Sequence, residues 1–548
     1  MSPEPSPAAP GSLGIVVAGS SSRGVDVRLD SEVSVEDIVV GRYVTVQGEK
    51  RRFFGMITEV SLETTDPTVA ASPPDTSDPL MSGIMRGTAT YGKMHVLLSL
   101  TLSGAVAGSA AQPEPVKSVP AHFSPVCTAT QADVELVFGS EDEKRYYIGT
   151  PLDMETKVCL DVLELVKRSN GVFGKTGTGK TFLTRLLLIG MIQKKAAVSL
   201  IFDMHSEYGW GTKKDERGLV PKGLKQIPSF ASLVQVFTLD EEGSRRRGIS
   251  PDFVVRIPYS DIEPEDIELL RLTLNLTEPA VQAAYQFARR YGEGWLQALM
   301  DLRGDDLKEV LKDLAVHEST HSNLRRGLAT LRRFSFLVSS PVENTVKRIL
   351  DSLERGINVV LEFGRFEDYA AYILVANLLS RRIYDTYRER TEKATAQNAA
   401  PPRPLVIVLE EAHRFLNPQL SGQTVFGTIA REMRKYNVTL LIVDQRPSGI
   451  DSEVLSQLGT KITCLLDNEQ DVDAVLGGVP GRGELKAVLS RLESKQQALI
   501  FGHSVPMPLV VRTREYGSAE SYKEFSAPPK RPGPAPDSPR DLDDLWPA

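Results

Sequence analysis

The residues that could bind a polyphosphate lie together between Gly174 and Thr181. This stretch reads Gly-Lys-Thr-Gly-Thr-Gly-Lys-Thr and satisfies the pattern G-x-x-x-x-G-K-[ST] at every fixed position. Glycines here let successive backbone N–H groups turn inward around phosphate oxygens, and the helix that follows adds the partial positive charge of its N-terminus. We therefore predict that the loop binds the phosphates of ATP through Gly174, Thr176, Gly177, Thr178, Gly179, Lys180 and Thr181.

Two residues of this loop have separate expected roles. Lys180 can reach the β- and γ-phosphates as a point charge, and the Thr181 hydroxyl is placed to bind the Mg²⁺ that bridges them. The flanking sequence supplies the order that such a loop requires, because residues 169–173 predict a short buried strand and residues 182–189 a largely buried helix. ATP and Mg²⁺ are the predicted cofactors.

A pair of carboxylates follows a second apolar strand. Residues 405–409 lead into Glu-Glu-Ala-His at positions 410–413. In nucleotide hydrolysis, one such acid commonly fixes the metal through water and the next polarises the attacking water. We predict that Glu410, which replaces the usual Asp, acts on the metal and that Glu411 acts on the water. Gln445 follows another apolar run, and its amide is predicted to sense the γ-phosphate or to hold the water.

A basic helix end precedes that run. Residues 429–436 read Ile-Ala-Arg-Glu-Met-Arg-Lys-Tyr. Such arginines are often solvated or paired with local acids; the alternative is an arginine finger presented to the nucleotide of a neighbouring subunit. Arg431 and Arg434 are the two candidates.

The elements that must position these groups alternate between strands and helices. Apolar runs at residues 197–203, 357–362, 405–409, 439–443, 461–465 and 497–501 predict strands, and a helix is predicted from Tyr369 to Tyr387. This alternation predicts an α/β core with a parallel, doubly wound sheet whose carboxyl edge faces the ligand. Residues 131–208 and 345–515 form this predicted core, and residues 209–344 are predicted to be a mostly helical insertion.

The two ends of the chain have different patterns. Short β-type runs between Leu13 and Leu102 predict a small barrel within residues 1–130, interrupted by a mobile loop at residues 64–82. Residues 516–548 are predicted to be a tail, whose Pro-rich and acidic end has too little apolar surface to fold.

Composition bounds the class of protein. A chain of 548 residues predicts two or three domains, and 41% apolar with 25% charged residues is typical of a globular protein. With no signal peptide and no long apolar run, we predict a cytoplasmic protein with no membrane contact. Its 3 cysteines predict neither a disulfide framework nor a zinc site. A net charge of −7 argues against a uniformly basic nucleic-acid binder but allows a basic channel, with Lys213, Lys214 and Arg217 as weak candidates for DNA contact.

Taken together, the motifs resemble those of the HerA family of hexameric DNA translocases, relatives of FtsK. The resemblance is carried by the loop from Gly174 to Thr181, by Phe-Asp-Met-His-Ser-Glu-Tyr at 202–208, by Glu-Glu-Ala-His at 410–413, and by Arg434-Lys435 followed by Asp-Gln-Arg-Pro at 444–447. It covers nearly the whole chain, since family members carry an N-terminal β-barrel and a helical insertion around a RecA-like core. It implies a homo-hexameric, ATP-driven ring that moves double-stranded DNA through its pore and works with the nuclease NurA in DNA end processing and repair.

The resemblance also implies roles for single residues. Asp203 and Glu207 would support the site, Glu411 would be the catalytic acid, and Arg434 matches the family's basic motif better than Arg431 as the finger acting in trans. The alternative function is a ring that organises an effector nuclease, similar to HerA-like proteins in antiviral defence. The N-terminal barrel is expected to dock the nuclease and to be dispensable for the ATPase fold; the alternative is a collar that stabilises the ring.

Overall fold

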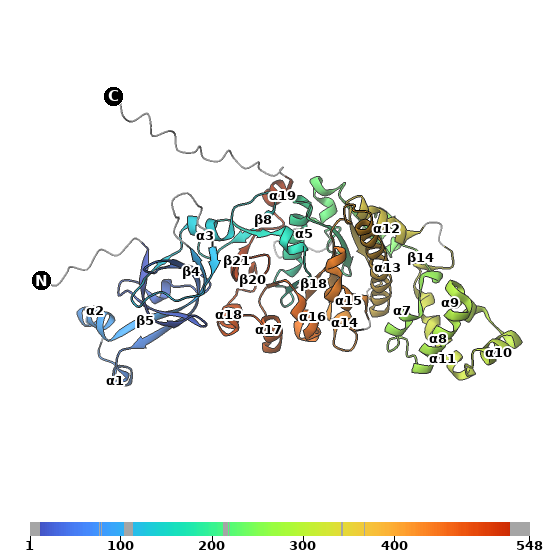
Figure 1. Ribbon diagram of the computed structural model, residues 1–548, viewed down its shortest axis with the longest axis horizontal. Coiled ribbons are helices and arrows are strands. Elements are labelled where there is room, and N and C mark those ends of the chain that lie inside the picture. Colours follow the sequence, from blue (N-terminus) through green and yellow to red (C-terminus); the bar gives the residue numbers. More distant parts are fainter. Residues whose placement is uncertain are drawn as a thin grey trace, which may run out of the picture.

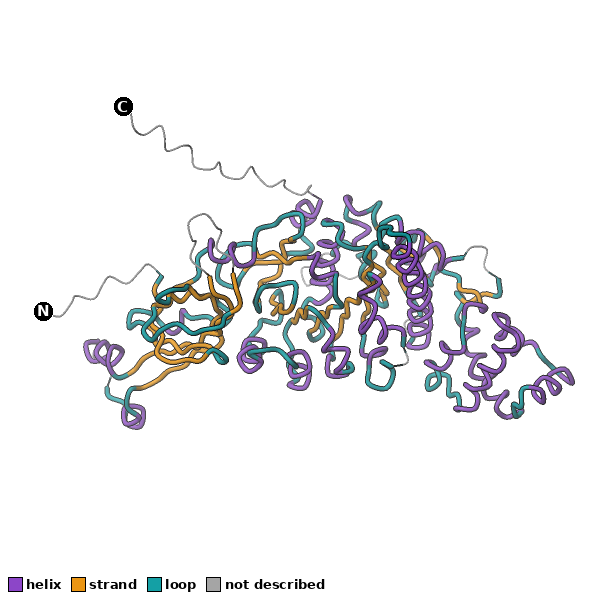
Figure 2. Tube along the Cα trace, viewed as in Figure 1, coloured by secondary structure: helices purple, strands orange, loops and turns teal. Residues whose placement is uncertain are grey.

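Three regions follow one another along the longest axis of the molecule: a β-barrel, an α/β core and a group of helices (Figure 1). The computed structural model describes residues 11–75, 77, 79–102, 113–211, 218, 220–340, 344–366, 368–422 and 424–526. Figure 2 shows that strands predominate in the first region and helices in the last, with both kinds of element in the core between them.

The N-terminal barrel is closed, as predicted. β2 pairs with β1 on one side and with β5 on the other, so the order β2-β1-β7-β3-β4-β5 forms a ring to which β6 adds at β5. Buried aliphatic side chains such as Val27, Val44 and Ile57 fill its interior. The strands are β1 (Ser12–Ser20), β2 (Gly24–Leu29), β3 (Tyr43–Gln47), β4 (Arg52–Thr64), β5 (Thr90–Leu102), β6 (Pro113–Pro115) and β7 (Pro125–Thr128).

β4 and β5 continue past the barrel as a long hairpin whose tip carries α1 (Pro67–Ala71) and α2 (Pro79–Thr88) (Figure 1). The prediction of a mobile loop over residues 64–82 is therefore wrong in part. The Asp66 carboxylate accepts the N–H of Thr68, and proline stands at the start of each helix, where its fixed φ favours helix initiation.

The core is built on a 12-stranded sheet. From β13 through β19 every pairing is parallel, whereas β20, β21, β8 and β9 extend the sheet with antiparallel pairings. The predicted parallel sheet is thus present from β13 to β19, and the short connection from β20 to β21 permits only an antiparallel pairing there. In order across the sheet the strands are β13 (Phe253–Val254), β12 (Val234–Thr238), β16 (Asn358–Glu362), β11 (Val198–Asp203), β17 (Leu405–Glu410), β18 (Val438–Asp444), β10 (Asn170–Phe173), β19 (Thr460–Thr463), β20 (Gln497–Gly502), β21 (Leu509–Thr513), β8 (Arg145–Thr150) and β9 (Val158–Asp161).

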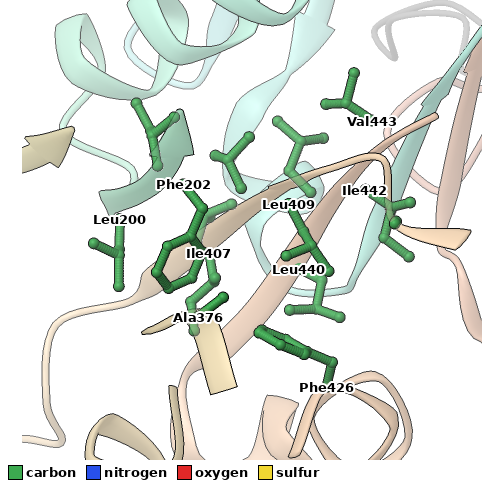
Figure 3. Close-up of a cluster of buried hydrophobic side chains, with 14 of the residues drawn as sticks. Leu200, Phe202, Ala376, Ile407, Leu409, Phe426, Leu440, Ile442 and Val443 are labelled. Carbon is green, nitrogen blue, oxygen red and sulfur yellow. The ribbon is translucent and has the colours of Figure 1, made fainter. Parts of the chain in front are cut away.

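Helices cover the sheet and bury its central strands. α5 (Lys180–Gln193) packs beside β10, and the long α13 (Tyr369–Ala396) lies near α15 (Val425–Glu432). Figure 3 shows the core where Phe202 and Ile407 meet Ala376 and Phe426; the Phe202 and Phe426 rings are 6.4 Å apart and nearly perpendicular. The remaining core helices are α3 (Gln131–Phe138), α4 (Val162–Val166), α6 (Glu241–Arg246), α12 (Thr345–Glu354), α14 (His413–Leu416), α16 (Ser452–Gln457), α17 (Glu469–Leu476), α18 (Arg482–Leu489) and α19 (Ala519–Ser526).

The helical region begins later than residue 209. β12 and β13 belong to the core sheet, and the chain leaves it at β14 (Ile257–Pro258), which pairs with β15 (Leu337–Val338) on the return. β12 has only five residues and lies next to a long helical stretch, so its apolar run was not predicted to be a strand. The helices between these short strands are α7 (Pro264–Leu269), α8 (Glu278–Tyr291), α9 (Trp295–Asp301), α10 (Gly304–Asp313) and α11 (Glu318–Ala329).

The barrel and the core share one packed interface. The ring of Tyr43 in the barrel stacks on Phe54 and lies 5.6 Å from the ring of Phe138, which follows the barrel in the chain. The Tyr43 hydroxyl also accepts the backbone N–H of Val510 in the core sheet at 3.0 Å. Removing residues 1–130 would expose Phe138 and leave this N–H without its partner, so the structure argues against a dispensable barrel.

The predicted tail at residues 516–548 begins as packed structure. Tyr522 and Phe525 of α19 are buried against the core, and residues 527–548 lie outside the described part of the chain. Across the described residues, none of the helices is both long enough and apolar enough to span a bilayer.

Candidate nucleotide-hydrolysis site

The phosphate loop joins β10 to α5 at the carboxyl edge of the core sheet. Gly177 and Gly179 have φ of 83° and 94°, a left-handed conformation that side chains larger than glycine disfavour. The loop is braced from behind, because the buried Thr178 hydroxyl donates to the carbonyl of Lys175 at 2.8 Å, and the Lys175 N–H donates to the carbonyl of Leu465. The loop is thus held open toward the sheet edge.

A cavity of about 520 Å³ lies in front of this loop. It brings together Thr176, Gly177, Gly179, Lys180, Thr181, Glu207, Glu410, Glu411 and Gln445 from the predicted set, and Phe182, Arg185, His205, Pro221, Val443 and Asp444 besides. Gly174 and Thr178 do not line it, since Gly174 begins the loop and Thr178 is buried behind it. Strands far apart in the sequence therefore meet at one site.

Lys180 is the first residue of α5, and its side chain folds back over the loop. Its ammonium donates to the carbonyl of Lys175 at 2.9 Å. Burial lowers the pKa of Lys180, while the nearby carboxylates of Glu411 and Asp444 favour its charged form. A partly desolvated cation beside a glycine-rich loop is suited to a phosphate chain.

The Thr181 hydroxyl donates to the Glu207 carboxylate at 3.2 Å. Glu207 is positioned by Asp203, whose two carboxylate oxygens accept the backbone N–H groups of Glu207 and Tyr208, each at 2.8 Å. Asp203 is fully buried, and burial raises its pKa. Asp203 therefore shapes the segment beside the site and does not itself line the cavity.

Glu410 ends β17 and is almost fully buried. Burial raises the pKa of its carboxyl well above the ordinary value, and the carboxylates of Asp203 and Glu207 raise it further. One oxygen accepts the Tyr208 hydroxyl at 3.1 Å, and the other has no hydrogen-bond partner among the described residues. An unsatisfied carboxylate oxygen in the same cavity as the Thr181 hydroxyl fits Mg²⁺, which prefers such oxygen ligands, so these two residues could hold the ion.

Glu411 belongs to a chain of hydrogen bonds that ends at the phosphate loop. The Gln445 amide donates to the two Glu411 oxygens at 3.2 and 3.3 Å, and its carbonyl oxygen accepts the Thr176 hydroxyl at 2.6 Å. The backbone of Glu411 is left-handed, with φ of 48°. This unusual conformation at a carboxylate in a cavity is of the kind that functional sites retain.

Asp444 and His413 are site residues to which the sequence analysis assigned no role. The buried Asp444 carboxylate accepts the backbone N–H of His413 at 2.7 Å and lies 3.0 Å from its ring Nδ1. This contact raises the pKa of His413. Asp444 ends an apolar strand as Asp203 does, so the same signal at the carboxyl end of a strand could have identified it.

Arg431 and Arg434 lie away from this cavity. They line a separate hollow with Arg168 and Ser169, which precede β10, and with Gly459, which precedes β19. These positions mark the amino edge of the parallel strands, whereas the phosphate loop is at their carboxyl edge. Within one chain neither arginine contacts the nucleotide cavity. Lys213, Lys214 and Arg217 lie outside the described residues.

Two family models match the chain. The model described as "Helicase HerA, central domain" matches residues 146–383, and the HAS barrel domain matches residues 13–79. The first match includes the phosphate loop, and the second lies in the N-terminal barrel.

Curated relatives cover much of the chain. The DNA double-strand break repair helicase HerA of Sulfurisphaera tokodaii is 25% identical over 92% of this chain and 93% of its own length. That of Pyrococcus furiosus is 24% identical over 69% of this chain and 70% of its own length. Among solved structures, VirB4 of Thermoanaerobacter pseudethanolicus is similar with a TM-score of 0.44 and 13% identity, covering 69% of this chain and 98% of VirB4. Plasmid coupling protein TrwB with an ATP analogue is similar with a TM-score of 0.45 and 10% identity, covering 71% of this chain and 94% of TrwB.

Proposed function

Because this chain belongs to the HerA family of helicases and is an ATPase, we propose that it acts as a homo-hexameric ring that moves double-stranded DNA through its pore. The coarser function, a DNA helicase or translocase, follows from the family. The ring, the duplex in its pore and a NurA-type nuclease partner in DNA end processing are the finer parts of the proposal.

The observation that carries the ring is the position of the arginines. Glu411, Gln445 and Lys180 meet in one cavity, while Arg431 and Arg434 line a hollow at the opposite edge of the sheet. Arg185 also lines the cavity, but its guanidinium donates to the backbone carbonyl of Glu207 and packs on two aromatic rings, so it is not placed as an arginine finger. We infer that a neighbour supplies the finger by turning its other edge toward the cavity. Repeating one such head-to-tail contact closes a ring when the rotation between neighbours divides a full turn evenly.

The residues divide the chemistry of hydrolysis between them. Lys180 and the loop amides bind the phosphates, and Thr181 with Glu410 would hold Mg²⁺, which neutralises phosphate charge when bound. Glu411 accepts a proton from the attacking water, and Gln445 fixes the direction of the Glu411 carboxylate through its hydrogen bonds.

We expect duplex DNA to raise ATP turnover at least severalfold, because a translocase couples each hydrolysis to a step along the strand. Steady-state turnover with and without a linear duplex, at low and at high salt, measures this. The stimulation should weaken at high salt, since contacts to phosphates release counterions. Turnover that is indifferent to DNA at every salt concentration would instead favour the alternative function, a ring that organises an effector nuclease in antiviral defence.

For the nuclease partner, the exposed hairpin tip is the surface we propose. Leu62 is 79% exposed and Ile84 of α2 is 51% exposed, and a ring would display this apolar tip once per subunit. The double variant Leu62→Glu/Ile84→Glu is expected to weaken binding of a NurA-type nuclease at least tenfold by titration calorimetry while ATP turnover is unchanged, since two buried charges oppose docking. Leu272→Glu, at an equally exposed leucine in the helical region, is the control. Equal nuclease affinity for the double variant and the control would place the docking surface elsewhere.

A further inference from the structure

The hydrolysis chemistry does not use every residue that lines the nucleotide cavity. Glu411, Gln445 and Thr176 of the loop are joined by hydrogen bonds and form the part that acts on the γ-phosphate and the water. Phe182 and Pro221 also line the cavity and carry no group that hydrolysis requires, and the Arg185 guanidinium is already engaged with the Glu207 carbonyl and two aromatic rings. Phe182 and Arg185 follow Lys180 and Thr181 in α5, whereas Pro221 belongs to the segment before β12.

Phe182 is unlike its neighbours in α5. The side chains from Leu183 to Ile192 are buried, whereas Phe182 is 36% exposed and lines the cavity. One face of its ring is supported, because it stacks on Tyr516 with ring centroids 5.7 Å apart and planes 25° from parallel. A supported aromatic ring that stays partly exposed in a polar cavity has apolar surface available for a ligand.

Arg185 holds this pair of rings in place. Its side chain is 4% exposed, and its guanidinium carbon lies 5.6 Å from the Phe182 centroid and 5.4 Å from that of Tyr516. It donates to the backbone carbonyl of Glu207, while its buried Nε has no hydrogen-bond partner in the described part of the chain. A buried cation against two ring faces fixes both rings at the cavity wall.

Tyr516 is itself anchored to the core. Its hydroxyl donates to the carbonyl of Lys222 at 2.5 Å, and its ring packs edge-on against Tyr522 of α19. The segment after β21 thus returns to support Phe182 from behind. Support of this kind keeps the rotamer of a binding residue fixed before the ligand arrives.

We propose that Phe182, supported by Tyr516, is the stacking surface for the purine base of the bound nucleotide. The inference rests on the ATPase function of the same cavity. With the γ-phosphate directed at Glu411 and Gln445, and Lys180 and Thr181 on the phosphates and metal, the rest of the nucleotide extends past the next side chain in α5, which is Phe182. Stacking needs only a π face, so both ATP and GTP should use this surface.

The test compares a ligand that has a base with one that lacks it. Titration calorimetry on the full chain measures the affinity of Mg-ATP, Mg-GTP and Mg-tripolyphosphate for the parent protein and for Phe182→Ala, Phe182→Leu and Phe182→Tyr. Phe182→Ala is expected to weaken ATP and GTP about tenfold and to leave tripolyphosphate unchanged, since base stacking is lost and the loop is not. Phe182→Tyr should bind ATP like the parent, and Phe182→Leu should resemble Phe182→Ala. Phe123→Ala, at a barrel phenylalanine that is 68% exposed, is the control.

Three outcomes would overturn the inference. ATP affinity that is unchanged in Phe182→Ala would exclude stacking on this ring. Equal losses of ATP and tripolyphosphate would mean that Phe182 supports the loop, and equal affinities for Phe182→Leu and Phe182→Tyr would mean that bulk alone matters. Failure of the parent protein to bind either ligand would contradict the ATPase function itself, which separates the two failures.

Discussion

Lys180→Ala is expected to weaken ATP binding by about 100-fold or more, whereas Glu411→Gln should bind ATP normally and lose about 10²- to 10⁴-fold in turnover. Lys180 contributes the desolvated charge at the centre of the phosphate loop, so its loss acts on the bound state as well as on the transition state. Glu411 acts on the water, and Gln at this position keeps the size of the side chain but removes the base. Calorimetric ATP affinity and steady-state turnover, measured on both variants, separate the two effects.

Lys175→Ala provides the matched control for the lysine. Lys175 lies in the same loop, but its ammonium pairs with the exposed Asp467 carboxylate at 2.8 Å and not with the inside of the loop. We expect an ATP affinity within a few fold of the parent. If Glu411→Gln turned over ATP at a rate close to that of the parent, Glu411 would not be the catalytic base.

Arg434→Ala is expected to lower turnover by about 10³-fold while ATP affinity stays near that of the parent, because a finger acts on charge that develops in the transition state. A finger that acts in trans is distinguished by the recovery of ATP turnover in rings that mix two inactive variants. A subunit that carries Arg434→Ala still has an intact phosphate loop, and a Lys180→Ala subunit still has an intact finger. In an equal mixture, about a quarter of the interfaces pair the two intact groups in the right order, and activity should return there.

Arg431→Ala, tested in the same mixtures, decides between the two candidate arginines, and Arg326→Ala on the exposed face of α11 is a control for loss of a surface charge. Subunit exchange is checked by fluorescence energy transfer between labelled subunits. Exchanged rings that stay inactive would contradict a finger in trans. So would full turnover by isolated monomers of the parent protein.

The sequence predicted the ligand edge of the sheet well, because a buried parallel strand is a continuous apolar run and its last polar residue is easily recognised. Asp203, Glu410 and Gln445 all follow such runs, and the structure places them at one edge. The direction of a strand relative to its neighbours could not be predicted, because the hydrophobic pattern of a strand is the same with a parallel and an antiparallel partner. β20 was predicted as a strand at residues 497–501, but its antiparallel pairing was not predicted, and β21, β8 and β9 were missed.

Contacts within the site were harder to predict than its members. The hydrogen bond from the Tyr208 hydroxyl to Glu410 depends on a turn that is held by the Asp203 carboxylate, five residues before Tyr208. The stack of Phe182 on Tyr516 joins residues that are far apart in the sequence. No local pattern encodes such pairs, because they follow from how the sheet brings distant segments together.

The left-handed backbone of Glu411 has a consequence for how this protein can change. In this conformation a side chain such as that of glutamate destabilises the fold by about 1 kcal/mol, whereas glycine has no such cost. Glycine at position 411 would relieve that strain and remove the carboxylate together. A library selected only for heat resistance is therefore expected to accept glycine at position 411, and such variants would be stable but inactive.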